Sequence, residues 1–190
     1  KQTNATFVQS NQLAFQYQAE RTIKQNIDMR INSPTLWSPE NPYLYELVVR
    51  IKKNGVIIDE YTKSIAFNDL KINKEGNQYS FILNGSPFDI KGIEYYENFN
   101  FANYEQMKKQ MEQDIVLIKS LGANLIRIRN FAPNPYLIEL CNKYGLFIII
   151  DIPARCIPSA ILATDEISVR LKNIADRMIF TYNSNVSLIA

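Results

Sequence analysis

The stretch from Phe88 to Pro153 decides the fold of this chain. It contains three short apolar segments, which read FDIKGI at 88–93, NLIRIRN at 124–130 and LFIIID at 146–151. The two intervals between these segments carry the apolar spacing of amphipathic helices. Strand, helix, strand, helix and strand at this spacing are typical of right-handed parallel β/α units. Residues 147–150 have no polar side chain, as expected of a parallel strand that is covered on both faces.

The helices have recognisable ends in the sequence. Asn103 can cap the first helix, and Gly122 can end it. Asn134-Pro135 can open the second helix, which Gly145 ends. A third helix is predicted from about 164 to 182, with an inward face that consists of Ile167, Leu171, Ile174, Met178 and Tyr182.

Residues 186–190 then begin a predicted fourth strand. Three parallel strands and part of a fourth leave an open sheet edge, so we expect self-association through this edge. The chain starts at Lys1 and shows no signal peptide. We therefore expect it to be a piece of a longer protein.

Residues 1–70 show only strand patterns. Apolar and polar residues alternate, with the period of half-buried antiparallel strands, over three segments: 13–19, 23–31 and 43–51. Asn54-Gly55 supplies a two-residue hairpin turn, and residues 56–67 return as the partner strand. The pattern predicts an immunoglobulin-like β-sandwich. We expect a partial one, because a sandwich of this type needs about seven strands.

The single tryptophan, Trp37, lies among prolines 34, 39 and 42. Because prolines fix an extended path and prevent a regular ladder, we interpret Trp37 as a rigid plug at the end of the sandwich or at its contact with the next domain. A tryptophan that stacks on a sugar is the alternative. The polar residues 71–77 mark the predicted boundary between a sandwich at 1–70 and an α/β domain at 78–190.

Composition excludes several classes of function. Charged residues make up 21% of the 190 residues and the net charge is +2, without a basic patch for nucleic acid. No apolar run is long enough to span a membrane. With no histidine and no CxxC pair, we expect no metal site and two unpaired thiols at Cys141 and Cys156. No glycine-rich phosphate loop is present, and we expect no cofactor.

The second parallel strand carries charges that a buried strand normally avoids. Alternation directs Ile126 and Ile128 to the helix layer, and it directs Arg127 and Arg129 into the interior of a parallel barrel. A buried guanidinium needs a partner, because an unpaired buried charge costs on the order of 3–5 kcal/mol.

Acidic residues end the neighbouring strands. Asp151 ends the third strand, and Glu94 and Glu97 end the first. All three lie at carboxyl ends of strands, where barrel active sites form. These residues predict either a structural ion-pair cluster under the loops or the floor of a polar substrate pocket, and the pattern favours neither.

Five motifs in this order resemble glycoside hydrolase family 2, which contains β-galactosidases, β-glucuronidases and β-mannosidases. LWSPENPYLY at 36–45 is similar to a segment near the end of the sandwich domain that precedes the catalytic barrel of this family. FILNGSP at 81–87 with KGI at 91–93 resembles the beginning of the barrel. The other three motifs are DIVLIKSLGANLIR at 114–127, PYLIELCNKYGLFIIID at 135–151 and NSNVSLIA at 183–190.

The resemblance implies the late part of the β-sandwich followed by the first three to four strands of a (β/α)₈ TIM barrel. It implies a retaining β-glycosidase, β-galactosidase-like, with two carboxylates about 5 Å apart and an oligosaccharide or β-glycoside as substrate. In this family the acid/base glutamate follows the fourth strand and the nucleophile comes later. We therefore expect that the chain alone lacks both catalytic residues and is inactive.

The resemblance also assigns pocket positions. Arg127 and Asp151 match residues that line the family's site. Tyr96 and Asn130 stand where the family often has histidines, and Ile152 stands where glutamate is common. The predicted substrate-binding residues are Tyr96, Glu97, Arg127, Asn130 and Asp151.

Two alternatives remain open at this point. The first is a non-catalytic relative that keeps the scaffold to bind carbohydrate or to assemble with partners. The second is a free-standing small α/β protein, which the unfinished fourth strand disfavours.

Overall fold

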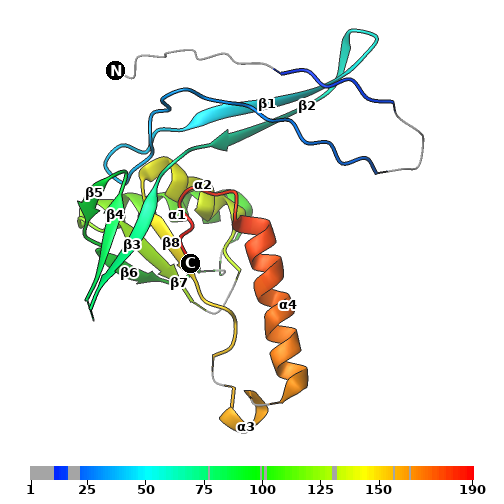
Figure 1. The fold of residues 1–190 in the computed structure, drawn as a ribbon. Coiled ribbons are helices and arrows are strands. Elements are labelled where there is room, and N and C mark those ends of the chain that lie inside the picture. The colour runs from blue at the N-terminus through cyan, green and yellow to red at the C-terminus, as the bar shows by residue number, and fades with distance from the viewer. Residues whose placement is uncertain are drawn as a thin grey trace. The chain divides into compact units, whose positions relative to one another are not determined.

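The computed structural model describes residues 11–16, 22–76, 78–98, 100, 102–129, 132–155, 157–162 and 164–190. The chain divides into two compact units, residues 1–34 and residues 35–190. Figure 1 shows the elements in chain order.

The first unit corrects two predicted strands. Residues 11–16 and 22–34, its described part, contain no strand and no helix. The strand predicted over 23–31 is therefore wrong, as is the described part of the one predicted over 13–19, whose last three residues lie outside the described residues. Alternation records which side chains are apolar, but a strand also needs a neighbouring strand to accept its backbone hydrogen bonds. Five apolar side chains of this unit stay 37–49% exposed: Leu13, Phe15, Ile23, Ile27 and Met29.

The second unit begins with the predicted hairpin. β1 (Tyr45–Lys53) pairs antiparallel with β2 (Val56–Ile65), in a register that opposes Tyr45 to Ile65. Asn54 and Gly55 form the turn with φ angles of 51° and 82°, the positive values that a two-residue hairpin requires. In the described part of the chain this hairpin is the whole of the expected sandwich, so an immunoglobulin-like sandwich is not confirmed.

A three-stranded antiparallel sheet follows, and its first strand occupies the polar residues that were expected to be a domain boundary. It consists of β3 (Leu70–Glu75), β4 (Gln78–Leu83) and β5 (Ser86–Phe88), in that order. Residues 71–75 are therefore strand and not linker, because they pair with residues 78–82 of β4. The polar side chains of this strand are exposed, and its partner strand satisfies its backbone.

The parallel sheet has the predicted topology. β6 (Gly92–Tyr95), β7 (Leu125–Ile128) and β8 (Phe147–Ile150) pair in the order β6-β7-β8 (Figure 1). The first parallel strand begins later than the predicted Phe88, because Phe88 pairs with Phe81 of β4 and the side chain of Asn124 binds the backbone between β5 and β6. This side chain accepts from Lys91 N at 2.8 Å and donates to Asp89 O at 2.7 Å.

The strand predicted over 186–190 is present as a single bridge, after a turn at residues 186–187. Leu188 forms a parallel bridge with Ile148 of β8. Ile150 N also donates to Ala190 O at 2.8 Å, which brings the last residue beside β8 (Figure 1).

The two helices that cover the parallel sheet begin where the caps predict. α1 (Tyr104–Ser120) starts after Asn103, whose side chain accepts from Gln106 N at 2.9 Å. α2 (Pro135–Tyr144) starts after Asn134, whose side chain accepts from Tyr136 N at 2.9 Å. Both first-turn donors are thereby satisfied.

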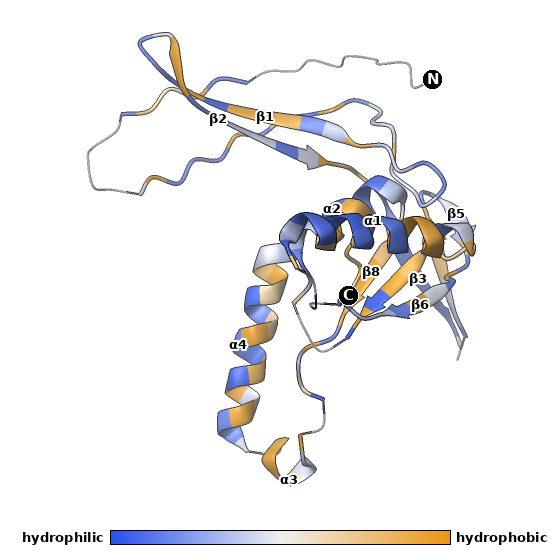
Figure 2. Cartoon of the chain, turned by 180° about the vertical axis from the view of Figure 1, so that it is seen from behind, coloured by the Kyte–Doolittle hydropathy of each residue, from blue (hydrophilic) through white to orange (hydrophobic). Residues whose placement is uncertain are grey.

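A short helix and a long one follow β8. They are α3 (Ser159–Leu162) and α4 (Asp165–Tyr182). Of the face predicted to be inward on α4, only Tyr182 is buried, and the other four side chains are half-buried. Figure 2 shows hydrophobic residues alternating with hydrophilic ones along this helix. None of the described helices combines the length and the apolarity that a membrane crossing requires.

Two apolar clusters lie on the two faces of the parallel sheet. On the helix side, Ile126 and Ile128 of β7 are 0% and 2% exposed and pack among residues of α1 and α2. On the other face, Leu125 and Phe147 pack against Trp37. Leu125 and Phe147 are the first residues of β7 and β8, so this second cluster closes the amino ends of the strands.

Trp37 is a structural plug. Its side chain is 0% exposed, its ring meets Phe147 edge-on at 5.0 Å, and its Nε1–H donates to Asn142 O at 2.8 Å. A buried indole that satisfies its donor in this way cannot stack on a sugar, so the alternative interpretation of Trp37 is excluded.

The segment after Trp37 is locked onto the helix ends. Lys119 at the end of α1 donates from Nζ to Pro39 O at 3.1 Å and to Gly145 O at 2.9 Å. Burial lowers the pKa of the Lys119 amine. Gly145 has φ +75°, and a Cβ on it would lie 2.4 Å from Pro39 O. Only glycine allows this backbone approach.

We expect Gly145→Ala to destabilise the protein more than Gly122→Ala. Gly122 also follows a helix with φ +81°, but no atom lies within 4 Å of its Cβ position. Gly122→Ala should therefore cost about 1–2 kcal/mol for the left-handed backbone alone. Gly145→Ala should lose about 1–3 kcal/mol more, because Pro39 must move. Urea denaturation measures both variants, and equal losses would contradict the close contact.

Candidate functional site

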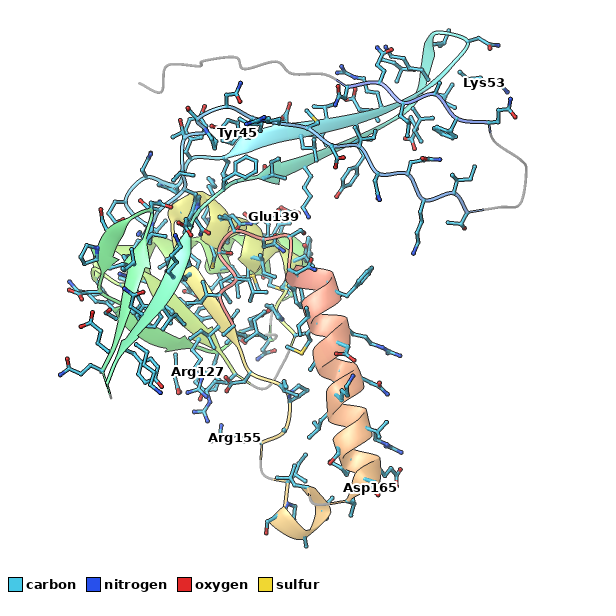
Figure 3. All side chains as sticks on the ribbon, viewed as in Figure 1. Tyr45, Lys53, Arg127, Glu139, Arg155 and Asp165 are labelled. Atoms are coloured by element: carbon cyan, nitrogen blue, oxygen red, sulfur yellow. The ribbon has the colours of Figure 1, made fainter. Side chains whose placement is uncertain are left out.

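Strand alternation places Arg127, the charged residue of β7, on the face opposite the helices. Ile126 and Ile128 face α1 and α2, as predicted, and Arg127 therefore lies on the same face as Leu125. Glu94 of β6 is the direct neighbour of Arg127 in the parallel ladder. Arg127 is labelled at the carboxyl end of β7 in Figure 3.

Two arginines and two carboxylates meet at this place. We call Glu94, Arg127, Arg129 and Asp151 the ion cluster. Arg127 donates from Nε to Asp151 Oδ1 at 2.9 Å and from Nη2 to Oδ2 at 3.0 Å, a bidentate pair. Arg129 donates from Nη1 to the two Glu94 oxygens at 3.2 and 2.9 Å. Longer contacts of 3.7 Å from Arg127 to Glu94 and 3.8 Å from Arg129 to Asp151 join the two pairs.

The ion cluster is balanced in charge and open to water. Its side chains are between 22% and 46% exposed, so the expected partners are present but the expected full burial is not. The hydrogen bond from Arg129 lowers the pKa of Glu94. The Glu94 carboxylate raises the pKa of Arg129, and Asp151 raises the pKa of Arg127. Glu94 and Arg129 therefore hold each other in the charged form.

Tyr96 lies at the side of the ion cluster. Its hydroxyl accepts from Arg129 Nη1 at 3.3 Å and donates to Glu94 Oε2 at 3.3 Å. The side chain is 56% exposed. A hydroxyl that both accepts and donates, next to a guanidinium with several donors, matches the groups that bind polyols.

Glu97 does not join the ion cluster. Its Oε1 accepts from Asn134 N at 2.9 Å, at the start of α2. Its Oε2 is buried and has no hydrogen-bond partner among the described residues. Burial raises the pKa of Glu97, although the hydrogen bond from Asn134 lowers it.

The other residues named in the sequence analysis lie outside the ion cluster or outside the described residues. Asn130 lies outside the described residues and stays a prediction, as does the state of Cys156. Ile152 is 40% exposed beyond the end of β8. Cys141 is wholly buried in α2, and burial raises the pKa of its thiol. The described residues contain no group of three acidic or cysteine side chains that could hold a metal ion.

The predicted substrate-binding set omits two members of the ion cluster. Glu94 and Arg129 interact with each other, and Arg129 also contacts Tyr96. Alternation already predicts Arg129 on the face of Arg127, and Glu94 is already predicted at the end of the neighbouring strand, but the substrate-binding set includes neither. The predicted set also includes Glu97. This residue comes three positions after Glu94, and its side chain therefore points to the helix side of the sheet, where it binds Asn134.

We expect Glu94→Gln to destabilise the protein at pH 7 and to have much less effect at pH 3. The folded-state pKa of Glu94 lies below its ordinary value of 4.5. The stability that its charge contributes is therefore present above pH 4.5 and is lost as the pH falls through the folded-state pKa. Thermal unfolding at both pH values measures the change, with Glu105→Gln, an exposed carboxylate of α1, as control. An equal effect at both pH values would contradict the role of the Arg129 pair.

Glu97→Gln should show the opposite pH dependence. Because burial raises the folded-state pKa of Glu97, folding favours its protonated form, and this contribution is lost as the pH rises from 4.5 through the raised pKa. The amide has no charge to bury, so Glu97→Gln should gain stability relative to the parent protein between pH 4 and pH 7. Thermal unfolding over this range tests it, and a relative loss would show that the ionised carboxylate is the favoured form.

Comparison with known proteins identifies the family. Residues 1–67 match glycosyl hydrolases family 2, and residues 74–177 match the TIM barrel domain of the same family. A β-galactosidase of Vibrio cholerae is 32% identical over 127 residues, which are 66% of this chain and 12% of that protein. A putative β-glucuronidase of Formosa agariphila is 29% identical over 123 residues, which are 65% of this chain and 15% of that protein.

Solved structures agree with this assignment. β-Glucuronidase 3 of Bacteroides uniformis superposes with a TM-score of 0.68 at 27% identity, over 82% of this chain and 19% of that one. β-Glucuronidase 2 of the same organism, covalently bound to cyclophellitol-6-carboxylate aziridine, gives 0.70 at 26% identity, over 86% and 19%. The chain thus spans about a fifth or less of these relatives. Its β/α units, its two matched regions and its relatives together show that the chain belongs to glycoside hydrolase family 2.

Proposed function

We propose that this chain is part of an enzyme that hydrolyses β-linked O-glycosides, and that the ion cluster forms part of the floor of its sugar pocket. The observation that carries the proposal is the position of the ion cluster. Four charged side chains gather at the carboxyl ends of parallel strands, on the face away from the helices, in a chain that belongs to glycoside hydrolase family 2. Barrel enzymes form their active sites at this end of the strands.

The chemistry of the ion cluster suits a sugar. Arg127 and Arg129 present N–H donors, and the carboxylates of Glu94 and Asp151 present acceptors in fixed orientations. Sugar hydroxyls donate and accept at once, so they bind to such mixed sets of groups. We propose that Arg127, Asp151 and Tyr96 face the substrate. Asn130 is proposed as a further contact from the resemblance alone.

The catalytic step needs groups that the ion cluster does not supply. A retaining glycosidase uses one carboxyl group that can hold a proton and one that attacks the anomeric carbon. The lowered pKa of Glu94 makes it a poor general acid, and both carboxylates of the ion cluster accept hydrogen bonds from arginine. We therefore propose that residues 1–190 alone do not hydrolyse glycosides and that the catalytic pair is supplied by other strands of the barrel.

The same proposal covers the domain organisation. We propose that residues 1–70 are the late part of an immunoglobulin-like sandwich, supported by the hairpin β1–β2 and by the family match over 1–67. We propose that residues 78–190 are the first part of the barrel, supported by the three parallel strands. The outer edge of this sheet is where the isolated chain is proposed to self-associate.

Kinetics on the full-length enzyme test the proposal. We expect it to hydrolyse at least one member of a panel of p-nitrophenyl β-glycosides that includes the galactoside, the glucuronide and the mannoside. Arg127→Ala should lower kcat/KM about tenfold or more, because a charged hydrogen-bond donor to the pocket is lost. Arg170→Ala, which removes an exposed arginine of α4 paired with Glu166, is the matched control and should keep the parent kcat/KM.

Two results would contradict the proposal. If no β-glycoside is hydrolysed while sugars still bind by calorimetry, the non-catalytic carbohydrate-binding scaffold becomes the better description. If Arg127→Ala behaves like Arg170→Ala in an active enzyme, the ion cluster is structural and does not line the pocket.

A further inference from the structure

The loop after β7 is held at both ends by the segment that ends β6. At its first end, Arg129 donates to the Glu94 carboxylate at 2.9 Å. At its second end, Asn134 N donates to Glu97 Oε1 at 2.9 Å. Glu94 thus binds Arg129, and Glu97, three residues after Glu94, binds Asn134, five residues after Arg129. The first contact belongs to the ion cluster, and the second lies on the helix side of the sheet.

A third contact holds the same loop from α4. The hydroxyl of Tyr182, which is 8% exposed, donates to Pro133 O at 3.2 Å. Asn134 also caps α2 through its own side chain, so its backbone N–H is free to bind Glu97. The backbone of residues 133–134 is therefore held by two side chains from distant parts of the chain. Pro133 O accepts from the buried Tyr182, and Asn134 N donates to the half-buried Glu97.

The surroundings of Glu97 explain why this bond matters. The titratable groups whose pKa its charge raises are Tyr95 of β6, Cys141 of α2 and Tyr182 of α4. All three are acids that are neutral at pH 7, and Tyr95 donates in turn to Asp114 of α1 at 2.9 Å. Among the described residues no cation pairs with Glu97, so the Asn134 N–H is the one donor that the structure gives to its carboxylate.

We propose that Glu97 is a positioning residue that fixes Asn134, the second end of the loop after β7, against the end of β6 and so supports the contact between Arg129 and Glu94 at the first end. The inference rests on the proposed function for its effect on substrate, because residue 129 belongs to the ion cluster. Glu97 itself does not touch the ion cluster. It acts through the backbone of Asn134. Substitution of Glu97 should make Asn134 more mobile without removing a group of the pocket.

Hydrogen exchange on the full-length protein tests the clamp directly. In Glu97→Ala, the amide of Asn134 loses its charged acceptor, and its exchange should accelerate about tenfold or more. Glu97→Gln keeps an acceptor oxygen at the same place and should exchange like the parent protein. Tyr182→Phe should raise the exchange of the same peptide less, because the Asn134 bond remains. Glu105→Ala, which removes an exposed carboxylate of α1, is the control.

Kinetics then separate positioning from a merely structural role. At 25 °C, Glu97→Ala should raise KM for the best β-glycoside about tenfold, and Glu97→Gln should restore it. Unchanged exchange at Asn134 in Glu97→Ala would overturn the clamp. Faster exchange with an unchanged KM would overturn the positioning of the pocket. If the protein hydrolyses no glycoside, the proposed function fails on its own, and the exchange of Asn134 still decides whether Glu97 holds the loop.

Discussion

Leu125, Ile126, Arg127 and Ile128 follow one another in β7, and each must point to the face opposite its neighbour. The rest of the structure depends on this constraint. Ile126 and Ile128 bind the helix layer, and Leu125 closes the amino end of the strands with Trp37 and Phe147. Arg127 is left on the face without helices, at the carboxyl end, where it needs a carboxylate. A shift of one residue in register would bury the guanidinium among the helices.

The amino ends of the strands are closed by a segment far away in sequence. Trp37 fills the space beneath β7 and β8 and donates to Asn142 of α2, and Asn142 accepts in turn from Ser187 N at 3.2 Å. Pro39 lies against Gly145 so closely that no side chain fits between them. These contacts lie at the end of the sheet opposite the ion cluster. The apolar closure and the proposed sugar pocket thus lie at opposite ends of the same strands, as in other barrels.

Two carboxylates of one short segment have opposite electrostatic roles. Glu94 faces two arginines, which keep it ionised, and Glu97 faces neutral acids and a single backbone N–H. Alternation along the segment after Glu94 separates them, because positions three apart point to opposite faces. One carboxylate therefore orients donors in the candidate pocket, while the other binds the backbone of Asn134 at the start of α2. The pair shows how little sequence distance is needed to change the function of a glutamate.

Much of the secondary structure and the topology of the parallel sheet could be predicted from the sequence. The caps at Asn103 and Asn134, the turn at Asn54-Gly55 and the order of the parallel strands all follow from short-range rules, because they depend on neighbours in the chain. The face on which Arg127 lies follows from alternation, and the family follows from five ordered motifs. Such rules could not predict contacts between residues that are distant in the sequence. Residues 23–31 alternate like a strand but form none with the described residues. Residues 71–75 look like a linker but pair with β4, and Glu97 binds Asn134 and not the arginines. In each case the outcome depends on which backbone or side chain the tertiary structure places beside the segment. The sequence of one segment does not determine that partner.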